Sequence, residues 1–179
     1  IDWKNEDFGD GTFSGSKIVG GWDFTTNTSI QSLNNVTSAH GTACAGIIGA
    51  LRNNAKGIAG IAGGDVSNNN TGVQLFSLGI YSADETINNS YAGDNLVANA
   101  LIEGATYNPN TGYGYGLNIE SNSWGGGTAS FILKSAVKSV FENNCIFVAS
   151  RGNKYPQNQF SITEKRYPAC FKDEWALNI

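Results

Sequence analysis

Residues 40–51 read HGTACAGIIGAL, a run in which small and apolar side chains would lie on every side of a helix. This composition predicts a buried helix, and its glycines allow neighbouring elements to approach closely. Apolar runs typical of strands lie on both sides, at residues 17–24 and 73–81, and a polar loop is expected at residues 25–39. The first half of the chain therefore reads as strand, helix and strand.

The second half of the chain continues this alternation. Amphipathic patterns predict helices over residues 95–107, with Asp94 as N-cap, and over residues 130–143. Apolar runs predict strands at residues 117–124, 145–149 and 174–179. Strands that alternate with helices indicate βαβ units and a parallel sheet. We therefore predict a three-layer α/β/α fold with a mainly parallel central sheet, in which residues 1–179 form part of one domain that is incomplete at both ends.

Composition excludes several classes of function. The chain has 179 residues, a net charge of −4 and only 15% charged residues, against about 25% in an average globular domain. No basic patch is available for a nucleic-acid backbone. No apolar run approaches the ~18 residues of a membrane helix. The chain has three Cys, widely spaced, and one His, which excludes a closed Cys/His zinc site.

The one histidine, His40, opens the predicted buried helix directly after a polar loop. A side chain at that position can lie at the mouth of the fold and act as a general base. Its position alone fits equally a helix-capping or loop histidine, so the choice depends on the surrounding sequence.

Several motifs occur along the whole chain in a fixed order. They are IDWKNEDF at residues 1–8, HGTACAGIIGA at 40–50, GIAGIA at 57–62, SWGG at 123–126, VASRGN at 148–153 and YPA at 167–169. In order and approximate spacing this set resembles the subtilisin-like serine proteases, the subtilases of the peptidase S8 class. The resemblance implies a subtilisin-like fold and a serine endopeptidase that works through an acyl-enzyme, acting on polypeptide substrates.

The resemblance assigns roles to two residues of the chain. His40 would be the general base and acid, because it matches the family's catalytic histidine. Asn153 would donate a hydrogen bond to the oxyanion, as the asparagine of the matching motif does. Without the histidine motif, Asn153 reads as a turn residue after Gly152.

A substrate site is implied by two further stretches. Ser123, Trp124 and Gly125 match the family strand that pairs with the substrate backbone, while Ser150 and Gly152 would form the other wall of the pocket. Trp124 also fits simple core packing. Between the wall residues, Arg151 replaces the family's usual small residue. Strand alternation turns it away from the pocket, whereas an inward Arg151 would favour acidic substrates.

Calcium is the one metal that the resemblance implies. Asp7 matches a calcium-binding carboxylate of many members, and the backbone oxygen of Leu51 and the side chain of Asn53 match further ligands. The loop at residues 51–54 is one residue longer than in subtilisin itself, so an ordinary solvated loop is the alternative. Catalysis by the family requires no cofactor.

The three cysteines allow different interpretations. Cys44 lies one helical turn after His40, where proteinase K-like and kexin-like members place a cysteine that would make the enzyme sensitive to mercurials. A small buried apolar residue is the simpler interpretation. Cys145 and Cys170 each precede a predicted strand, and those strands are neighbours, which allows a disulfide without requiring one.

Two triad members are not found in the sequence. In the family, the catalytic aspartate lies three residues before the position that matches Ile1, and the nucleophile follows in a Gly-Thr-Ser motif that is absent here. Asp23 could replace the aspartate only by an unusual arrangement. We therefore expect a central section of a longer protease domain, inactive by itself.

Two other functions remain as alternatives to an enzyme. One is an inactive binding or scaffold protein on the same fold, although such a protein has no need of His40 or Asn153. The other is an Asn/Gly-rich surface adhesin, which the lack of a regular short repeat disfavours. The resemblance also implies a bacterial protein that is secreted or on the cell surface, with a propeptide as a partner that inhibits it.

Overall fold

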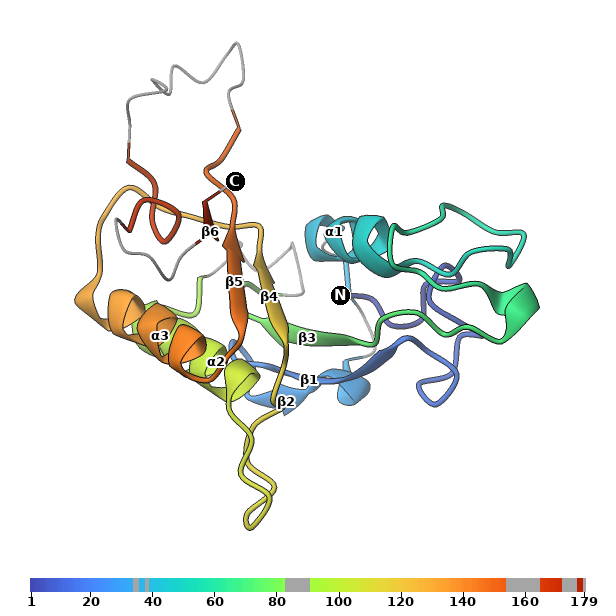
Figure 1. Cartoon of the computed structure of the whole chain (residues 1–179), viewed down its shortest axis with the longest axis horizontal. Coiled ribbons are helices and arrows are strands. Elements are labelled where there is room, and N and C mark those ends of the chain that lie inside the picture. Colours follow the sequence, from blue (N-terminus) through green and yellow to red (C-terminus); the bar gives the residue numbers. More distant parts are fainter. Residues whose placement is uncertain (34–35, 38, 83–90, 154–164, 172–176, 179) are drawn as a thin grey trace. The chain divides into compact units, whose positions relative to one another are not determined.

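The computed structural model describes residues 1–33, 36–37, 39–82, 91–153, 165–171 and 177–178. Contacts divide the chain into two compact units, Ile1–Ala92 and Gly93–Ile179. Each unit combines parallel strands with helices, as the α/β prediction requires (Figure 1). The assignment of both units to one domain stays a prediction, and each unit is described by itself.

The first unit contains a sheet of three strands in the order β2-β1-β3. The strands are β1 (Ile18–Asp23), β2 (Thr28–Ser29) and β3 (Leu75–Gly79). β1 runs parallel to β3, with Trp22 opposite Leu78, and antiparallel to β2, with Trp22 opposite Ser29. β1 and β3 confirm the strands that were predicted from the apolar runs at residues 17–24 and 73–81.

The segment predicted as a polar loop, residues 25–39, contains more structure than expected. β2 and a 3-10 helix, η1 (Ile30–Ser32), both fall within it. Ile30 is 1% exposed and belongs to a core that also contains Trp3, Phe8, Ile18 and Ala45. These two elements contain only two and three residues, which is too short for a hydrophobic period to show in the sequence.

The helix predicted at residues 40–51 is α1 (His40–Gly49). Its predicted burial is only partly right, because Ala45, Gly46 and Gly49 are buried whereas Ile47 is 59% exposed. The GIAGIA segment at residues 57–62 is bound to its carboxyl end, because Ile61 and Ala62 donate backbone hydrogen bonds to Ile47 and Ile48. A Cβ on Gly60 would lie 2.3 Å from the backbone nitrogen of Ala50, so only glycine permits this approach. A second 3-10 helix, η2 (Val66–Asn68), follows this segment.

A buried lysine connects β1 with the segment around η2. Lys17 directly precedes β1 and is 7% exposed. Its Nζ donates to the carbonyl oxygens of Gly63, at 2.8 Å, and Thr71, at 2.5 Å. Burial lowers the pKa of this ammonium group. The two carbonyl oxygens replace part of the hydration that the charge loses on burial.

The second unit contains a parallel sheet in the order β4-β5-β6. Its strands are β4 (Ile119–Asn122), β5 (Ile146–Ala149) and β6 (Leu177–Asn178), and its helices are α2 (Asp94–Ala105) and α3 (Phe131–Glu142). α2 and α3 pack on each other, α2 contacts β4 and α3 contacts β5 (Figure 1). Along β4, Glu120 and Asn122 are buried, whereas Ile119 and Ser121 are exposed.

Helix starts in this unit agree only in part with the sequence. Ser130 is the N-cap of α3, and its Oγ accepts a hydrogen bond from the backbone N–H of Leu133. The prediction of Asp94 as N-cap is wrong, because Gly93 occupies the cap position and Asp94 is the first helical residue. The carboxylate still lies in the first turn, where the helix dipole favours negative charge.

All three cysteines are free thiols, so Cys145 and Cys170 do not form the disulfide that the sequence allowed. Cys145 is buried, and burial together with the charge of Glu120 raises the pKa of its thiol to about 12. Among the helices of the described residues, none is long and apolar enough to cross a membrane.

Candidate active site

His40 is the first residue of α1, and its side chain is exposed. The Sγ atom of Cys44, one turn later, lies 4.0 Å from Nε2 of His40. The expected proximity of Cys44 to the histidine is therefore present in the structure. An exposed imidazole at a helix start is accessible to a substrate, as a general base must be.

The first residues of the chain pack against the first turn of α1. The backbone N–H of Asp2 donates to Thr42 Oγ1 at 2.9 Å, and a Cβ on Gly41 would lie 3.9 Å from Ile1. The amino nitrogen of Ile1 donates to Ser77 on β3. The start of the IDWKNEDF motif thus contacts Thr42, which lies two residues after His40 in α1.

The side chain of Asp23 stabilises a turn at the end of β1. It is 1% exposed, and its Oδ1 accepts hydrogen bonds from the backbone N–H groups of Thr25 and Thr26 and from the hydroxyl of Thr25. These three donors compensate for the burial of the carboxylate.

The predicted substrate strand directly follows β4. The backbone N–H of Ser150 donates to the carbonyl of Asn122 at 2.9 Å, and the indole N–H of Trp124 donates to the side chain of Asn122. A Cβ on Gly125 would lie 3.0 Å from the carbonyl oxygen of Tyr167 and 3.8 Å from that of Ser150. The structure therefore brings Ser123–Gly125 together with Ser150 at the carboxyl ends of two parallel strands, where α/β folds bind ligands.

The predicted pocket wall continues from β5. Ser150 is half-buried, and its Oγ accepts a hydrogen bond from the backbone N–H of Gly152 at 3.1 Å. Gly152 has φ of +93°, a conformation that L side chains rarely adopt. Arg151, Gly152 and Asn153 are exposed. The chain thus leaves the buried strand through a glycine turn and presents Asn153 at the surface.

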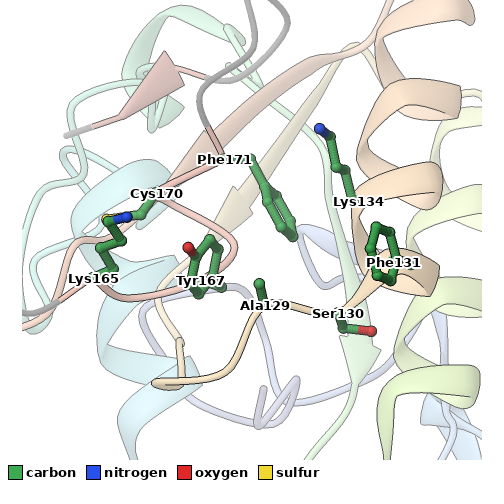
Figure 2. A pocket seen from close by; sticks show the side chains of 8 residues that line it. All are labelled: Ala129, Ser130, Phe131, Lys134, Lys165, Tyr167, Cys170 and Phe171. Atoms are coloured by element: carbon green, nitrogen blue, oxygen red, sulfur yellow. The ribbon is translucent and has the colours of Figure 1, made fainter.

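The YPA motif is joined to the substrate strand. Gly126 and Tyr167 exchange two backbone hydrogen bonds, of 2.8 and 2.7 Å. An open pocket of about 280 Å³ lies beside this bridge. Its described lining, shown in Figure 2, consists of Ala129, Ser130, Phe131, Lys134, Lys165, Tyr167, Cys170 and Phe171.

Arg166 was not among the residues that the sequence motifs singled out. Its side chain lies against Gly152, with Cδ 2.9 Å and Nε 3.3 Å from the point that a Cβ of Gly152 would occupy. The only available signal was its position, one residue before the YPA motif. This position indicates where Arg166 lies along the chain but not which way its side chain points.

The proposed calcium ligands come from two segments of the first unit that are hydrogen-bonded to each other. The backbone N–H of Leu51 donates to the carbonyl of Asp7 at 2.8 Å, and the Asp7 carboxylate accepts from Ile58 at 3.2 and 3.3 Å. Asn53 instead donates through Nδ2 to Asp65 at 2.8 Å. The backbones of Asp7 and Leu51 are therefore adjacent, and a carboxylate and a carbonyl oxygen are of the type that calcium prefers.

Asp65, which accepts a hydrogen bond from Asn53, was not singled out from the sequence. Hydrogen bonds from Ser67 and Asn53 lower the pKa of its carboxyl from 3.8 to about 2. Arg52 lies 3.7 Å away as an ion-pair partner. Within the described ranges, no group of three or more His, Cys, Asp or Glu side chains is arranged to hold a metal ion.

The chain belongs to the Subtilase family, whose model, Peptidase_S8, matches residues 1–175. It is 31% identical to thermitase of Thermoactinomyces vulgaris over 161 residues, which are 90% of this chain and 47% of thermitase. It is also 31% identical to subtilisin DY of Bacillus licheniformis, over 76% of this chain and 41% of that protein. The resemblance predicted from the motifs is thereby confirmed.

A solved structure supports the same fold. The crystal structure of fervidolysin from Fervidobacterium pennivorans, described as a keratinolytic enzyme related to subtilisin, aligns with a TM-score of 0.59 and 26% sequence identity. The alignment covers 84% of this chain and 20% of that chain. The chain thus spans about half the length of thermitase and smaller shares of the other relatives. The predicted subtilisin-like α/β fold is confirmed.

Proposed function

We propose that this chain is the central section of a serine endopeptidase. The observation that carries the proposal is an exposed His40 at the start of a glycine-packed helix, in a chain of the Subtilase family. His40 acts as general base and acid, and Asn153 as oxyanion donor. The triad aspartate and serine lie in segments outside residues 1–179.

The proposed chemistry is acyl transfer. His40 accepts the proton of the serine hydroxyl as its oxygen attacks the peptide carbonyl, and then gives that proton to the leaving amine. The side-chain NH2 of Asn153 donates to the oxyanion of the tetrahedral intermediate. Ser123–Gly125 pair with the substrate backbone, which fixes the carbonyl relative to Asn153. Water then repeats the cycle on the acyl-enzyme.

A structural calcium ion is part of the proposal. The backbones of Asp7 and Leu51 are hydrogen-bonded to each other, and the Asp7 carboxylate, the Leu51 carbonyl and the side-chain oxygen of Asn53 would be the ligands. The ion would connect the segment before β1 with the loop after α1, so its contribution is to stability. Catalysis needs no step through it.

The partners and location follow from the same proposal. The substrate is a polypeptide, and a propeptide would occupy the substrate strand before activation. The named relatives come from bacteria, which supports a bacterial protein that is secreted or on the cell surface.

A fluorophosphonate probe tests this function in the full-length protein that carries residues 1–179. We expect one covalent adduct by intact mass and loss of labelling in His40→Ala, because the hydroxyl then has no base. Asn153→Ala should lower kcat by about 10²–10³, while the neighbouring substitution Arg151→Ala serves as control. A folded protein that takes no probe and cleaves no peptide would support the inactive binding protein instead.

A further inference from the structure

The loop between α2 and β4, residues 106–118, forms a narrow projection from the second unit (Figure 1, yellow-green). Its two halves are joined by backbone hydrogen bonds. The N–H of Asn108 donates to the carbonyl of Tyr113, and the N–H of Gly116 donates to the carbonyl of Thr106, both at 2.8 Å. Because this loop leads into the amino end of β4, it lies at the opposite end of that strand from Ser123–Gly125, which follow its carboxyl end.

Glu103 places a negative charge at the base of this loop. It lies in the last turn of α2, which contains no basic residue, and the helix dipole is also negative there. Within the part of the chain that the structure describes, Glu103 takes part in no ion pair. The residue is half-buried, and burial raises the pKa of its carboxyl group. A cation that bound beside Glu103 would therefore balance a negative potential that the protein itself leaves uncompensated there.

Two tyrosines of the loop lie close to this carboxylate. The backbone N–H of Tyr115 donates to the carbonyl oxygen of Glu103 at 2.9 Å, which brings the end of the loop back to α2. Burial and, to a smaller extent, the charge of Glu103 raise the pKa of both Tyr113 and Tyr115. Tyr113 is 50% exposed and Tyr115 is half-buried, so solvent reaches both residues. Glu103, Tyr113 and Tyr115 therefore form one accessible group of side chains, the tyrosine–glutamate cluster.

The chemistry of the tyrosine–glutamate cluster matches an organic cation. The faces of tyrosine rings attract cations, and the carboxylate supplies a charged partner. Arg suits both, since its planar guanidinium stacks on aromatic rings and pairs with a carboxylate through two N–H donors. A neutral ligand could use the rings but would leave the charge of Glu103 unbalanced. The net charge of −4 for the whole chain also favours a basic partner.

The rest of the loop favours a polypeptide as the source of this cation. Residues 107–116 read YNPNTGYGYG, and Tyr, Asn and Gly are also enriched in the antibody loops that bind proteins. Tyr107, which is 61% exposed, and the exposed residues 108–112 extend the surface beyond the cluster. A peptide chain can contact this surface on both sides of one basic side chain, whereas a small amine can contact only the cluster.

We propose that Glu103, Tyr113 and Tyr115 form a binding site for an Arg or Lys side chain of a polypeptide partner. The guanidinium or ammonium group lies against the two rings and pairs with the carboxylate, while the exposed part of the loop contacts the neighbouring peptide. This site does not depend on the proposed function, because none of its residues belongs to the substrate strand or carries a catalytic role. It would hold a basic polypeptide whether or not the protein cleaves peptides.

The binding of two peptides to the full-length protein that carries residues 1–179 tests the proposal. The peptides are identical except that Arg in one is replaced in the other by citrulline, which keeps the shape of the side chain but carries no charge. The His40→Ala variant is used throughout so that neither peptide is cleaved, and isothermal titration calorimetry measures both affinities. We expect the Arg peptide to bind about tenfold more tightly, because only the guanidinium cation pairs with Glu103.

Matched variants connect this preference to the cluster. Glu103→Gln keeps the size of the side chain and should abolish the preference for Arg. Glu142→Gln removes the same charge from an exposed position of α3 and should leave the preference unchanged. Tyr113→Leu should lower the preference about threefold, whereas Tyr107→Leu, at another exposed tyrosine of the same loop, should retain it. Thermal unfolding identifies any variant that fails to fold, and Tyr113→Leu remains informative if Glu103→Gln does not fold.

Three outcomes would overturn the proposal. The first is equal affinity for the two peptides. The second is a preference that survives in Glu103→Gln, or that Glu142→Gln removes to the same extent, since the net charge of the protein would then be its cause. The third is binding of tetramethylammonium without a preference for the Arg peptide, which would assign the cluster to a small organic cation instead of a polypeptide.

Discussion

Glu120 is a carboxylic acid in the interior of the second unit. It is 5% exposed, and neither carboxyl oxygen has a hydrogen-bond partner among the described residues. Burial raises the pKa of this carboxyl from 4.5 to about 8. The group is therefore mostly neutral at pH 7, since an ionised carboxylate without a partner is costly to bury.

Replacing Glu120 should change how the free energy of unfolding depends on pH. The pKa is higher in the folded than in the unfolded state, so folding retains a proton between about pH 4.5 and about pH 8, and stability falls as pH rises through that range. Glu120→Gln should remove this loss, which is about 3 kcal/mol between about pH 6 and about pH 9. Urea unfolding at both pH values measures it.

The exposed Glu142 provides the control for this prediction. It pairs with Lys138 at the surface, so Glu142→Gln should leave the slope of stability against pH unchanged between the same two pH values. A Glu120→Gln variant that keeps the wild-type slope would contradict the assignment of the slope to Glu120.

Single residues differ in how far the sequence could place them. His40 and Asn153 could be proposed from local motifs, because the resemblance is carried by neighbouring residues. Glu120 and Arg166 could not, since their properties come from contacts with residues distant in the chain. Glu120 occupies a strand position that alternation marks as inward, but only the packed structure shows that no described residue is hydrogen-bonded to its carboxyl group.

At the scale of elements, the length of each segment and its pattern of apolar residues decided whether the sequence could predict it. The helices α2 and α3 were predicted from a repeat of apolar positions, and α1 and the strands β1, β3, β4, β5 and β6 from runs of apolar residues. β2 and η1 contain two and three residues and are too short for any period. Caps depend on one residue, so they were less well predicted. The cap of α2 was predicted at Asp94, one residue after its position at Gly93, and Ser130, predicted as the first residue of a helix, is the cap of α3.

The cap of α3 gives a prediction at this scale. Ser130→Ala removes the acceptor for the N–H of Leu133 and should lower the free energy of unfolding by about 1 kcal/mol. Ser135→Ala, at an exposed position inside the same helix, should be neutral or slightly stabilising because alanine is the better helix former. Urea unfolding of both variants makes the comparison. Equal stability of the two would show that the Ser130 hydroxyl contributes nothing as a cap.

For the whole molecule, the proposed calcium ion predicts a change in thermal stability. Binding to the folded state alone raises the melting temperature, so EDTA should lower the Tm of the wild-type protein and added calcium should restore it. Asp7→Asn should remove the difference between the two conditions, since the charged donor is lost. Asp10→Asn changes an exposed carboxylate nearby and should retain it. A wild-type Tm that is the same with and without EDTA would exclude the ion.

Whole-chain properties were partly predictable as well. Family membership and the α/β class followed from motifs spread over residues 1–169, because the order of several motifs is much more specific than any one of them. The disulfide was not decided, since two cysteines that precede neighbouring strands still need suitable geometry, and both are free thiols here.

The contact of Lys17 with Gly63 and Thr71 has a consequence for how this protein can vary. One ammonium group holds both ends of the segment between those residues, and Asp65 and Asn70 are bonded to each other inside it. The residues at the tip of this segment, Ser67 to Asn69, are exposed and lie between the two residues that Lys17 binds. Insertions at this tip would therefore leave the sheet unchanged, and an affinity tag or fluorescent label could be introduced there.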